Sequence, residues 1–301
     1  MLLHTNRDLF EQTILHVAKH SNIEPAIIEK DFFVSLLLKE LADRLPAMIF
    51  KGGTSLSKCH NVIKRFSEDI DITLDENHLS QGNRKSVKVA IEESCSTLGF
   101  TITNIDDIKS RMDFNHYKIE YPGIFTVNGL KPNIEIDTIF SIKSFPSEHK
   151  LATSILYDYL NDTGMEKFIN DYELAPFCVN TQSLDRTFID KIFALCDYYL
   201  EGKTSEHSRH LYDIHKLLPL ISDINSIRHL AKETREARIN SPFCKSADPA
   251  IDINATLKSI LDENFYEKDY KDKTSVLLYE DVPYEKTKLS ISKIIESKIF
   301  E

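Results

Sequence analysis

The stretch FKGGTSLSKCHNVIKRFSEDIDITL, residues 50–74, constrains the fold more than any other part of this chain. A short apolar run ends in two adjacent glycines, and a turn rich in hydroxyl groups then opens a helical segment. An alternating run follows, in which Asp69 and Asp71 flank an isoleucine. Alternation with a period of two is typical of a β-strand that buries one face. The stretch therefore predicts a strand–turn–helix–strand unit with two carboxylates on one face of its second strand.

The paired glycines suit a tight turn that lets an anion approach the backbone. Glycine has no Cβ, so the chain bends freely and a bulky ligand meets the amides directly. The N–H groups at the start of the following helix carry partial positive charge, which favours phosphate. The spacing does not match the P-loop pattern GxxxxGK[ST]. The residues predicted to bind a nucleotide here are Lys51, Gly52, Gly53, Thr54 and Ser55.

The two aspartates form a candidate metal site. Neighbouring residues on one strand face lie about 7 Å apart, and hard carboxylate oxygens are the ligands that Mg²⁺ prefers. A third ligand is expected from the run NIEID, where Glu135 is favoured and Asp137 is its alternative or its support. Charges in an otherwise apolar strand are costly to bury unless they are paired or bind a metal. We therefore predict a Mg²⁺ site, with Mn²⁺ as a second possibility, although a half-exposed strand face remains an open alternative.

The rest of the chain predicts an α+β fold: a small mixed sheet with flanking helices, followed by a helical C-terminal domain. Helical patterns dominate after about residue 150, and the run Phe145-Pro146-Ser147 places the division near residues 146–152, giving domains 1–148 and 149–301. Helices are expected at 6–20, 24–45, 54–63 and 84–98, and strands at 47–50, 70–74, 101–105, 115–121 and 133–140. Beyond residue 150, helices are expected at 151–160, 182–200, 205–218, 223–234, 251–264 and 284–300.

Composition excludes several classes of protein. The net charge of −10 is unlike that of proteins that coat nucleic acid nonspecifically. No apolar run is long enough to span a membrane, and the N-terminus lacks the apolar core of a secretory signal. The five cysteines form no CxxC pair and are expected to be reduced thiols. We therefore expect a cytoplasmic location and no membrane partner.

The second half of the chain offers three further candidate residues. Lys191 lies beside an apolar helical stripe, where it would either extend to solvent or bind an anion. Arg209 and Asp213 are four residues apart on one helix, so a surface ion pair remains possible. The histidines at 207, 210 and 215 do not follow the HExxH pattern, which disfavours a zinc site.

Several of these motifs together resemble a known family. KGGTSLSK followed by RFSEDIDI is similar to the first motif of nucleotidyltransferases with the polymerase-β-like fold, and more narrowly to the AbiEii/MenT-type toxins. EKDFF at 29–33 resembles the family's N-terminal helix, and NIEID at 133–137 its next motif. RTFIDKIFALCD and RHLYDIHKL resemble its later Lys-helix and R-x-x-x-D motifs. The resemblance spans residues 24–218.

The resemblance implies a Mg²⁺-dependent nucleotidyltransferase toxin of a toxin–antitoxin or abortive-infection system. Such an enzyme would transfer NMP from an NTP to an RNA 3′ end, often the acceptor end of tRNA, and stop translation. A cognate antitoxin would restrain it. The residues implied as catalytic are Asp69, Asp71, Glu135, Lys191 and Asp213, with Arg209 and Lys191 neutralising the triphosphate. Two alternatives remain: nucleotidylation of a protein or small molecule, and an NTP-binding regulator without turnover.

Overall fold

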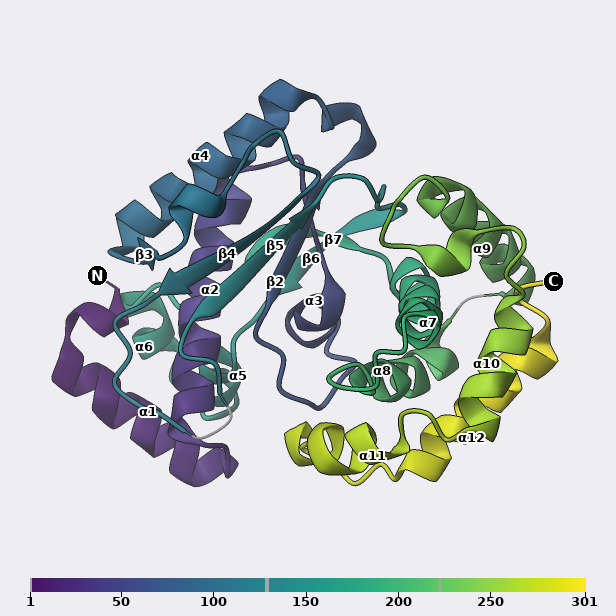
Figure 1. The fold of residues 1–301 in the computed structure, drawn as a ribbon. Coiled ribbons are helices and arrows are strands. Elements are labelled where there is room, and N and C mark those ends of the chain that lie inside the picture. Colours follow the sequence, from purple (N-terminus) through teal and green to yellow (C-terminus); the bar gives the residue numbers. More distant parts are fainter. Residues whose placement is uncertain (1, 128–129, 222) are drawn as a thin grey trace. The chain divides into compact units, whose positions relative to one another are not determined.

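The chain forms two compact units, one built on a seven-stranded mixed sheet and one made of helices (Figure 1). These are seen in a computed structural model that describes residues 2–127, 130–221 and 223–301. The α+β class with a helical second part, expected from the sequence, is confirmed. The first unit comprises Met1–Cys59, Ser67–Phe140 and Glu148–Thr181, and the second comprises His60–Phe66, Ser141–Ser147 and Gln182–Glu301.

Both units are discontinuous in sequence, because two short segments of the first half belong to the helical unit. The elements up to the last strand are α1 (Arg7–Ser21), α2 (Pro25–Arg44), β1 (Met48–Lys51), α3 (Gly52–Lys58), β2 (Ile70–Leu74), α4 (Gln81–Leu98), β3 (Thr101–Ile102), β4 (Phe114–Glu120), β5 (Ile134–Ile139), β6 (Ser147–Ala152), α5 (Ile155–Asp162), α6 (Glu166–Asp171) and β7 (Phe177–Gln182). The helices that follow are α7 (Leu184–Leu200), α8 (Arg209–Leu217), α9 (Ile224–Arg238), α10 (Ile253–Asp262), α11 (Glu267–Asp269) and α12 (Tyr284–Ser297).

The sheet has the strand order β3-β4-β5-β2-β1-β7-β6. The pairs β1–β2, β3–β4 and β4–β5 are antiparallel, whereas β2–β5 and β1–β7 are parallel. The sequence prediction that the sheet cannot be wholly parallel is therefore correct. The two strands that carry the predicted carboxylates, β2 and β5, lie next to each other.

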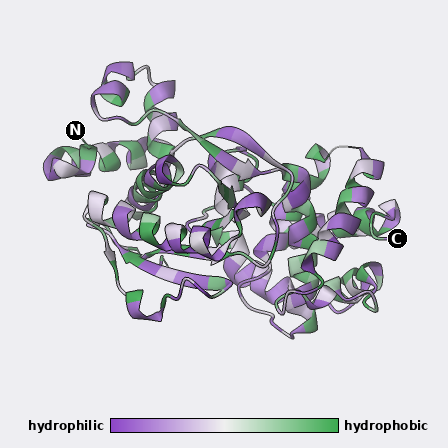
Figure 2. Cartoon of the chain, turned by 90° about the horizontal axis from the view of Figure 1, so that it is seen from above, coloured by the Kyte–Doolittle hydropathy of each residue, from purple (hydrophilic) through white to green (hydrophobic). Residues whose placement is uncertain are grey.

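The strands alternate because one face of the sheet is buried and the other carries polar residues. Ile70 and Ile72 of β2 and Ile134 and Ile136 of β5 are at most 1% exposed. Full burial of such a side chain contributes about 1.5–3 kcal/mol relative to leaving it in water. Helices α2 and α4 pack against each other, and most helices show a hydrophobic and a hydrophilic side (Figure 2). The sheet and the amphipathic helices thus share one core in this unit.

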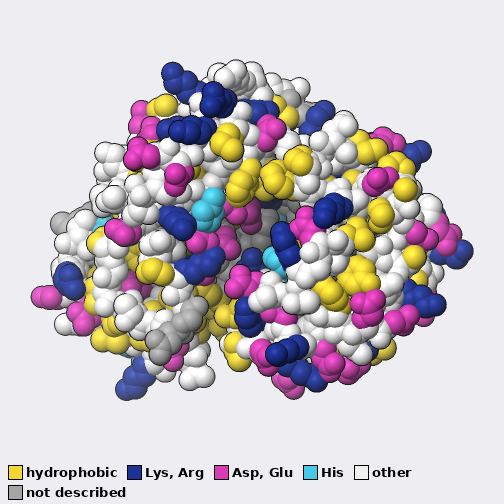
Figure 3. Space-filling model, in the orientation of Figure 1, with side chains coloured by type: hydrophobic (Ala, Val, Ile, Leu, Met, Phe, Trp, Pro, Cys, Tyr) yellow, Lys and Arg dark blue, Asp and Glu magenta, His cyan; other side chains and the backbone are white. Residues whose placement is uncertain are grey.

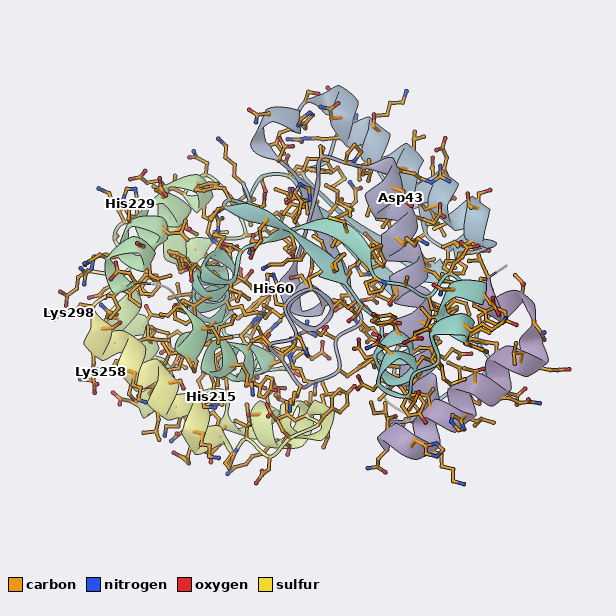
Figure 4. The ribbon with its side chains drawn as sticks, turned by 180° about the vertical axis from the view of Figure 1, so that it is seen from behind. Asp43, His60, His215, His229, Lys258 and Lys298 are labelled. Atoms are coloured by element: carbon orange, nitrogen blue, oxygen red, sulfur yellow. The ribbon has the colours of Figure 1, made fainter. Side chains whose placement is uncertain are left out.

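The second unit is a helical bundle in which α7 packs on α8 and α8 packs on α12. Its core includes Phe188, Ile192, Leu211 and Ile291, all fully buried. The side chains of His229, Lys258 and Lys298 lie at the outer rim of this unit (Figure 4). Among the helices in the described part of the chain, none is both long enough and apolar enough to cross a membrane.

Three differences from the sequence-based expectations have physical reasons. The helix expected at 54–63 ends at Lys58, because the chain turns there and Asn61 adopts a left-handed φ of 50°. The helix expected at 151–160 begins only at Ile155, after strand β6. Strands β6 and β7 were not expected. β6 is an edge strand in which only Ala152 is buried, so its sequence shows little apolar alternation.

Candidate functional site

Four carboxylates lie close together at one face of the sheet: Asp71 on β2, Glu135 and Asp137 on the neighbouring β5, and Asp69 directly before β2. Asp71 and Asp137 are register partners across the two parallel strands. Asp69 and Glu135 lie two residues earlier in the chain, and side chains two residues apart on a strand share a face. All four are partly exposed, whereas the isoleucines between them are buried. The register therefore brings together the four acidic residues that the sequence singled out.

Asp71 explains why a glycine is needed at the end of β1. Gly52 has a φ of +81°, in the region that favours glycine. A Cβ added there would lie 2.0 Å from Asp71 Oδ2, so no side chain fits beside that carboxylate. Lys51, the residue before this glycine, is the register partner of Asp71 on β1. The glycine bend and the aspartate strand are thus in direct contact within the first unit.

The hydroxyl groups of the turn serve the local structure. Thr54 and Ser55, at most 1% exposed, lie in the first turn of α3 with Gly53. Thr54 Oγ1 is 2.9 Å from Ser67 Oγ, which ties the turn to the segment before β2. Ser55 Oγ donates to the carbonyl of Gly52 at 3.0 Å. These contacts stabilise the bend, so phosphate contacts at this turn would come from the backbone amides.

Two cationic or titratable side chains contact the carboxylates. Lys131 Nζ contacts Glu135 Oε2 and lies 3.8 Å from Asp69 Oδ1. His116 Nδ1, on β4, lies 2.7 Å from Asp137 Oδ1. Burial raises the pKa of Asp137, and the hydrogen bond with His116 opposes that rise. The acidic face thus carries its own counter-charges.

Three consecutive charged residues of α2 each hold a different segment near this face. Glu29 accepts hydrogen bonds from the amides of residues 124 and 125 at 2.7 and 3.0 Å. Lys30, fully buried, contacts Glu68 Oε2 and donates to the Lys131 carbonyl at 2.8 Å. Asp31 binds Lys58 Nζ of α3 at 2.5 Å. Buried charges require such partners, so this helix turn fixes the segments around the site.

The second unit holds the other three predicted residues, Lys191 on α7 and Arg209 and Asp213 on α8. Asp213 is fully buried and binds Lys191 Nζ through Oδ2 at 2.6 Å. It also accepts two hydrogen bonds from Arg65, Nε to Oδ1 at 2.7 Å and Nη2 to Oδ2 at 2.8 Å. The alternative of a surface ion pair between Arg209 and Asp213 is therefore wrong, because Asp213 is fully buried.

The carboxyl group of Asp213 stays ionised because of the two cations beside it. Burial alone would raise the pKa of its carboxyl, but Arg65 and Lys191 outweigh burial and hold the pKa well below its usual range. Burial lowers the pKa of Lys191, and Asp213 opposes that effect. His210 on the same helix is held neutral, because burial, together with Lys191 and Arg209, lowers its pKa well below the usual value. Asp213 is thus placed to orient the ammonium of Lys191.

Some functional candidates escaped the sequence analysis. Arg65 and Lys58 occur within the motif-bearing stretch, but no local spacing indicates their partners, which lie 148 and 27 residues away. Lys30 was missed for the same reason, and Lys131 was missed although one of its partners, Glu135, lies only four residues away. One signal was available: three adjacent charges in the strongly apolar helix at 24–45 indicate buried, paired side chains.

The donor set fits a hard divalent cation in chemistry, although not in its present side-chain arrangement. The carboxylate oxygens of β2 and β5 are ligands suited to Mg²⁺. Across the described residues, no three His, Cys, Asp or Glu side chains are arranged to hold a metal ion as they stand. Lys131 and His116 contact three of the four carboxylates, and side-chain rotation would be needed to direct those oxygens to one point.

A groove of about 410 Å³ in the second unit lies between α9 and the last residues of the chain. Arg228 donates to the Lys298 carbonyl at 3.1 Å, and Arg235 donates to several backbone carbonyls of residues 246–251. Its arginines therefore stabilise the local fold. Figure 4 labels His229, which lines this groove, and Lys298, which precedes the lining residue Ile299.

Comparison with known proteins identifies the family of this chain. Residues 35–288 match the family model described as "Nucleotidyl transferase AbiEii toxin, Type IV TA system". The chain belongs to the AbiEii nucleotidyltransferase toxin family. Family membership makes it a nucleotidyltransferase toxin of a type IV toxin–antitoxin system and implies an NTP substrate and an antitoxin partner. The resemblance stated from the sequence is thereby confirmed.

One solved structure extends the likeness to the fold of nearly the whole chain. MenT4, a nucleotidyltransferase toxin from Mycobacterium tuberculosis H37Rv, matches with a TM-score of 0.54 and 16% sequence identity. The match covers 94% of this chain and 88% of that one. No curated protein matches the sequence.

Proposed function

We propose that this chain is a Mg²⁺-dependent enzyme that transfers NMP from an NTP to the 3′ end of an RNA. The acceptor end of tRNA is the proposed target, and blocked translation is the proposed result. The observation that best supports the proposal is the set of four carboxylates on, or directly before, the neighbouring strands β2 and β5, beside the Gly52 bend. Such a face suits a metal-bound triphosphate. The metal ion needs hard anionic oxygen ligands, and the phosphates need an open turn with accessible backbone amides.

Asp69, Asp71 and either Glu135 or Asp137 would hold the metal ion, Mg²⁺ or Mn²⁺. Bound there, the ion would lower the pKa of the attacking 3′-hydroxyl and stabilise charge on the leaving pyrophosphate. The contact between Asp71 and Gly52 keeps the acidic face next to the turn. The same contact would therefore keep the phosphates within reach of the metal ligands.

The remaining predicted residues would bind and neutralise the triphosphate. Lys51 and the backbone amides of residues 52–55 would hold phosphate oxygens. Lys191 and Arg209 would offset negative charge that develops in the transition state, with Asp213 orienting the lysine. Positioning and electrostatics account for most of the rate enhancement in reactions of this kind.

The charge distribution restricts any contact with RNA to a small part of the surface. Lys and Arg side chains are interspersed with Asp and Glu over the face in Figure 3, and the net charge is −10. Uniform coating of nucleic acid would require a basic surface. We propose that only the 3′ end of the acceptor engages the enzyme closely, and that it does so in the cytoplasm.

The test is incubation of the purified chain with each labelled NTP, Mg²⁺ and total tRNA. Label should enter RNA with wild type and with Glu120→Gln, a matched control that changes an exposed carboxylate at the end of β4. It should not enter RNA with Asp69→Asn. RNA of unchanged length in the wild-type reaction would contradict the proposal.

The two alternatives give different results in the same assay. Nucleotidylation of a protein predicts label on polypeptide and none on RNA. A regulator without turnover predicts NTP binding with no release of pyrophosphate. The acidic net charge is the observation that favours a protein or small-molecule acceptor.

A further inference from the structure

The ammonium of Lys131 bridges the two acidic strands. It contacts Glu135 Oε2 on β5 and lies 3.8 Å from Asp69 Oδ1, the residue that precedes β2. These are two of the carboxylates assigned to the metal. Carboxylates this close repel one another when no cation lies between them. Lys131 supplies that cation from within the chain.

The backbone at Lys131 is held in place by the buried side chain of Lys30. Its carbonyl accepts a 2.8 Å hydrogen bond from Lys30 Nζ, and the same ammonium contacts Glu68, the neighbour of Asp69. Lys30 is fully buried in α2. Lys30 thus anchors the start of the Lys131 segment to the segment that carries Asp69.

The side chain of Lys131, by contrast, is free to leave. It is half exposed to solvent, whereas the side chains of Asp69 and Glu135 are 21% and 15% exposed. An exposed ion pair contributes little net free energy, so a lysine with an anchored backbone can move its ammonium between two positions at small cost. One position lies on the carboxylates, and the other extends into water.

We propose that Lys131 is a tethered counter-ion that occupies the carboxylates of the acidic face and must be displaced before a divalent cation binds them. This inference rests on the proposed function, because it assumes that Asp69 and Glu135 are metal ligands. An ammonium and a divalent cation about 4 Å apart repel strongly, so both cannot share the same two carboxylates. Lys131 therefore sets the metal concentration at which the site fills.

The experiment is titration of the full chain with Mn²⁺ alone, followed by calorimetry and by the loss of the free-ion EPR signal. Removing the competing charge in Lys131→Met should tighten the apparent Kd about tenfold, a discounted value because the lysine is half exposed. Lys131→Arg keeps the charge and should bind Mn²⁺ within about twofold of wild type.

Lys167→Met is the matched control. Lys167 forms the same kind of i,i+4 pair with a carboxylate, Asp171, on the surface of α6. Its substitution should leave Mn²⁺ binding unchanged. Thermal melts of each variant without metal identify any loss of folding.

The outcomes separate this inference from the proposed function. A wild-type Kd that Lys131→Met leaves unchanged or weakens would overturn the counter-ion role. Weaker binding would mean that the lysine assists the metal complex. If Asp69→Asn binds Mn²⁺ as tightly as wild type, the metal site itself is wrong and the proposed function fails with it.

Discussion

Asp213→Asn tests the reasoning about the buried cluster of the second unit. The carboxylate is fully buried and contacts two cations, Arg65 at 2.7 and 2.8 Å and Lys191 at 2.6 Å. At an effective dielectric constant of about 20, two unit charges about 4 Å apart attract by roughly 4 kcal/mol. Desolvation of the charges offsets much of this attraction, so the sum over both cations overstates the net effect.

The variant leaves two buried cations without their anion. Removing one partner of a buried ion pair costs about 3–5 kcal/mol, and we expect a loss in this range from the free energy of unfolding. The assay is urea denaturation followed by circular dichroism. Glu285→Gln is the control, because Glu285 pairs with Lys288 on α12 but is 71% exposed, and its loss should cost less than about 1 kcal/mol.

A second substitution strengthens the test. Adding Lys191→Met to Asp213→Asn removes one of the two surplus charges, so part of the lost stability should return. A double variant less stable than Asp213→Asn, or a single variant that loses less than about 1 kcal/mol, would refute the view that this cluster is a tightly coupled ion triad.

Three further predictions concern pH, the glycine bend and the buried lysine of α3. The folded-state pKa of Asp213 lies below its ordinary value of 3.8, because its two cations outweigh burial. The difference in free energy of unfolding between wild type and Asp213→Asn, measured by urea titration, should therefore stay constant between about pH 5 and 7. It should shrink as the pH falls below about 4. Gly52→Ala should abolish nucleotidyl transfer in the labelled-NTP assay, because its Cβ would displace the Asp71 carboxylate; unchanged activity would contradict the contact. Lys58→Met should lower the free energy of unfolding by about 3–5 kcal/mol, since it removes the cation paired with the buried Asp31 carboxylate and leaves it the hydrogen bond from the Ile155 amide. A smaller loss by calorimetry would mean that the carboxylate reaches water.

The sequence predicted those parts of the fold whose signals are local. Helix α2 and strand β2 follow from apolar periodicity, and the structure buries residues 28–38 of α2 on every side of the helix. Strand β6 escaped prediction because an edge strand with an exposed, charged sequence has no such periodicity. A strand with one buried face, such as β2, shows a periodic pattern in its sequence. At the edge of the sheet β6 has no such pattern, and its pairing with the neighbouring strand determines that it forms.

The same distinction applies to the candidate site. The pattern of alternating acids predicted Asp69 and Asp71, and the register of β2 with β5 brings them beside Glu135. Arg65 and Lys30 could not be found this way, because their partners lie far along the chain. Charge pairing of this kind depends on the completed fold, whereas a run of alternating residues depends only on the strand.

The three adjacent charged residues of α2 make the length of this helix critical. Glu29, Lys30 and Asp31 each bind a separate segment, and each needs its own direction around the helix axis. Inserting one residue just before them would turn all three side chains by about 100° around the helix axis. Each side chain would then lose its contact with its partner segment. A similar insertion near the exposed end of the helix at Arg44 leaves these directions intact. Relatives of this toxin should therefore vary in length at the end of that helix and keep a constant spacing through its middle.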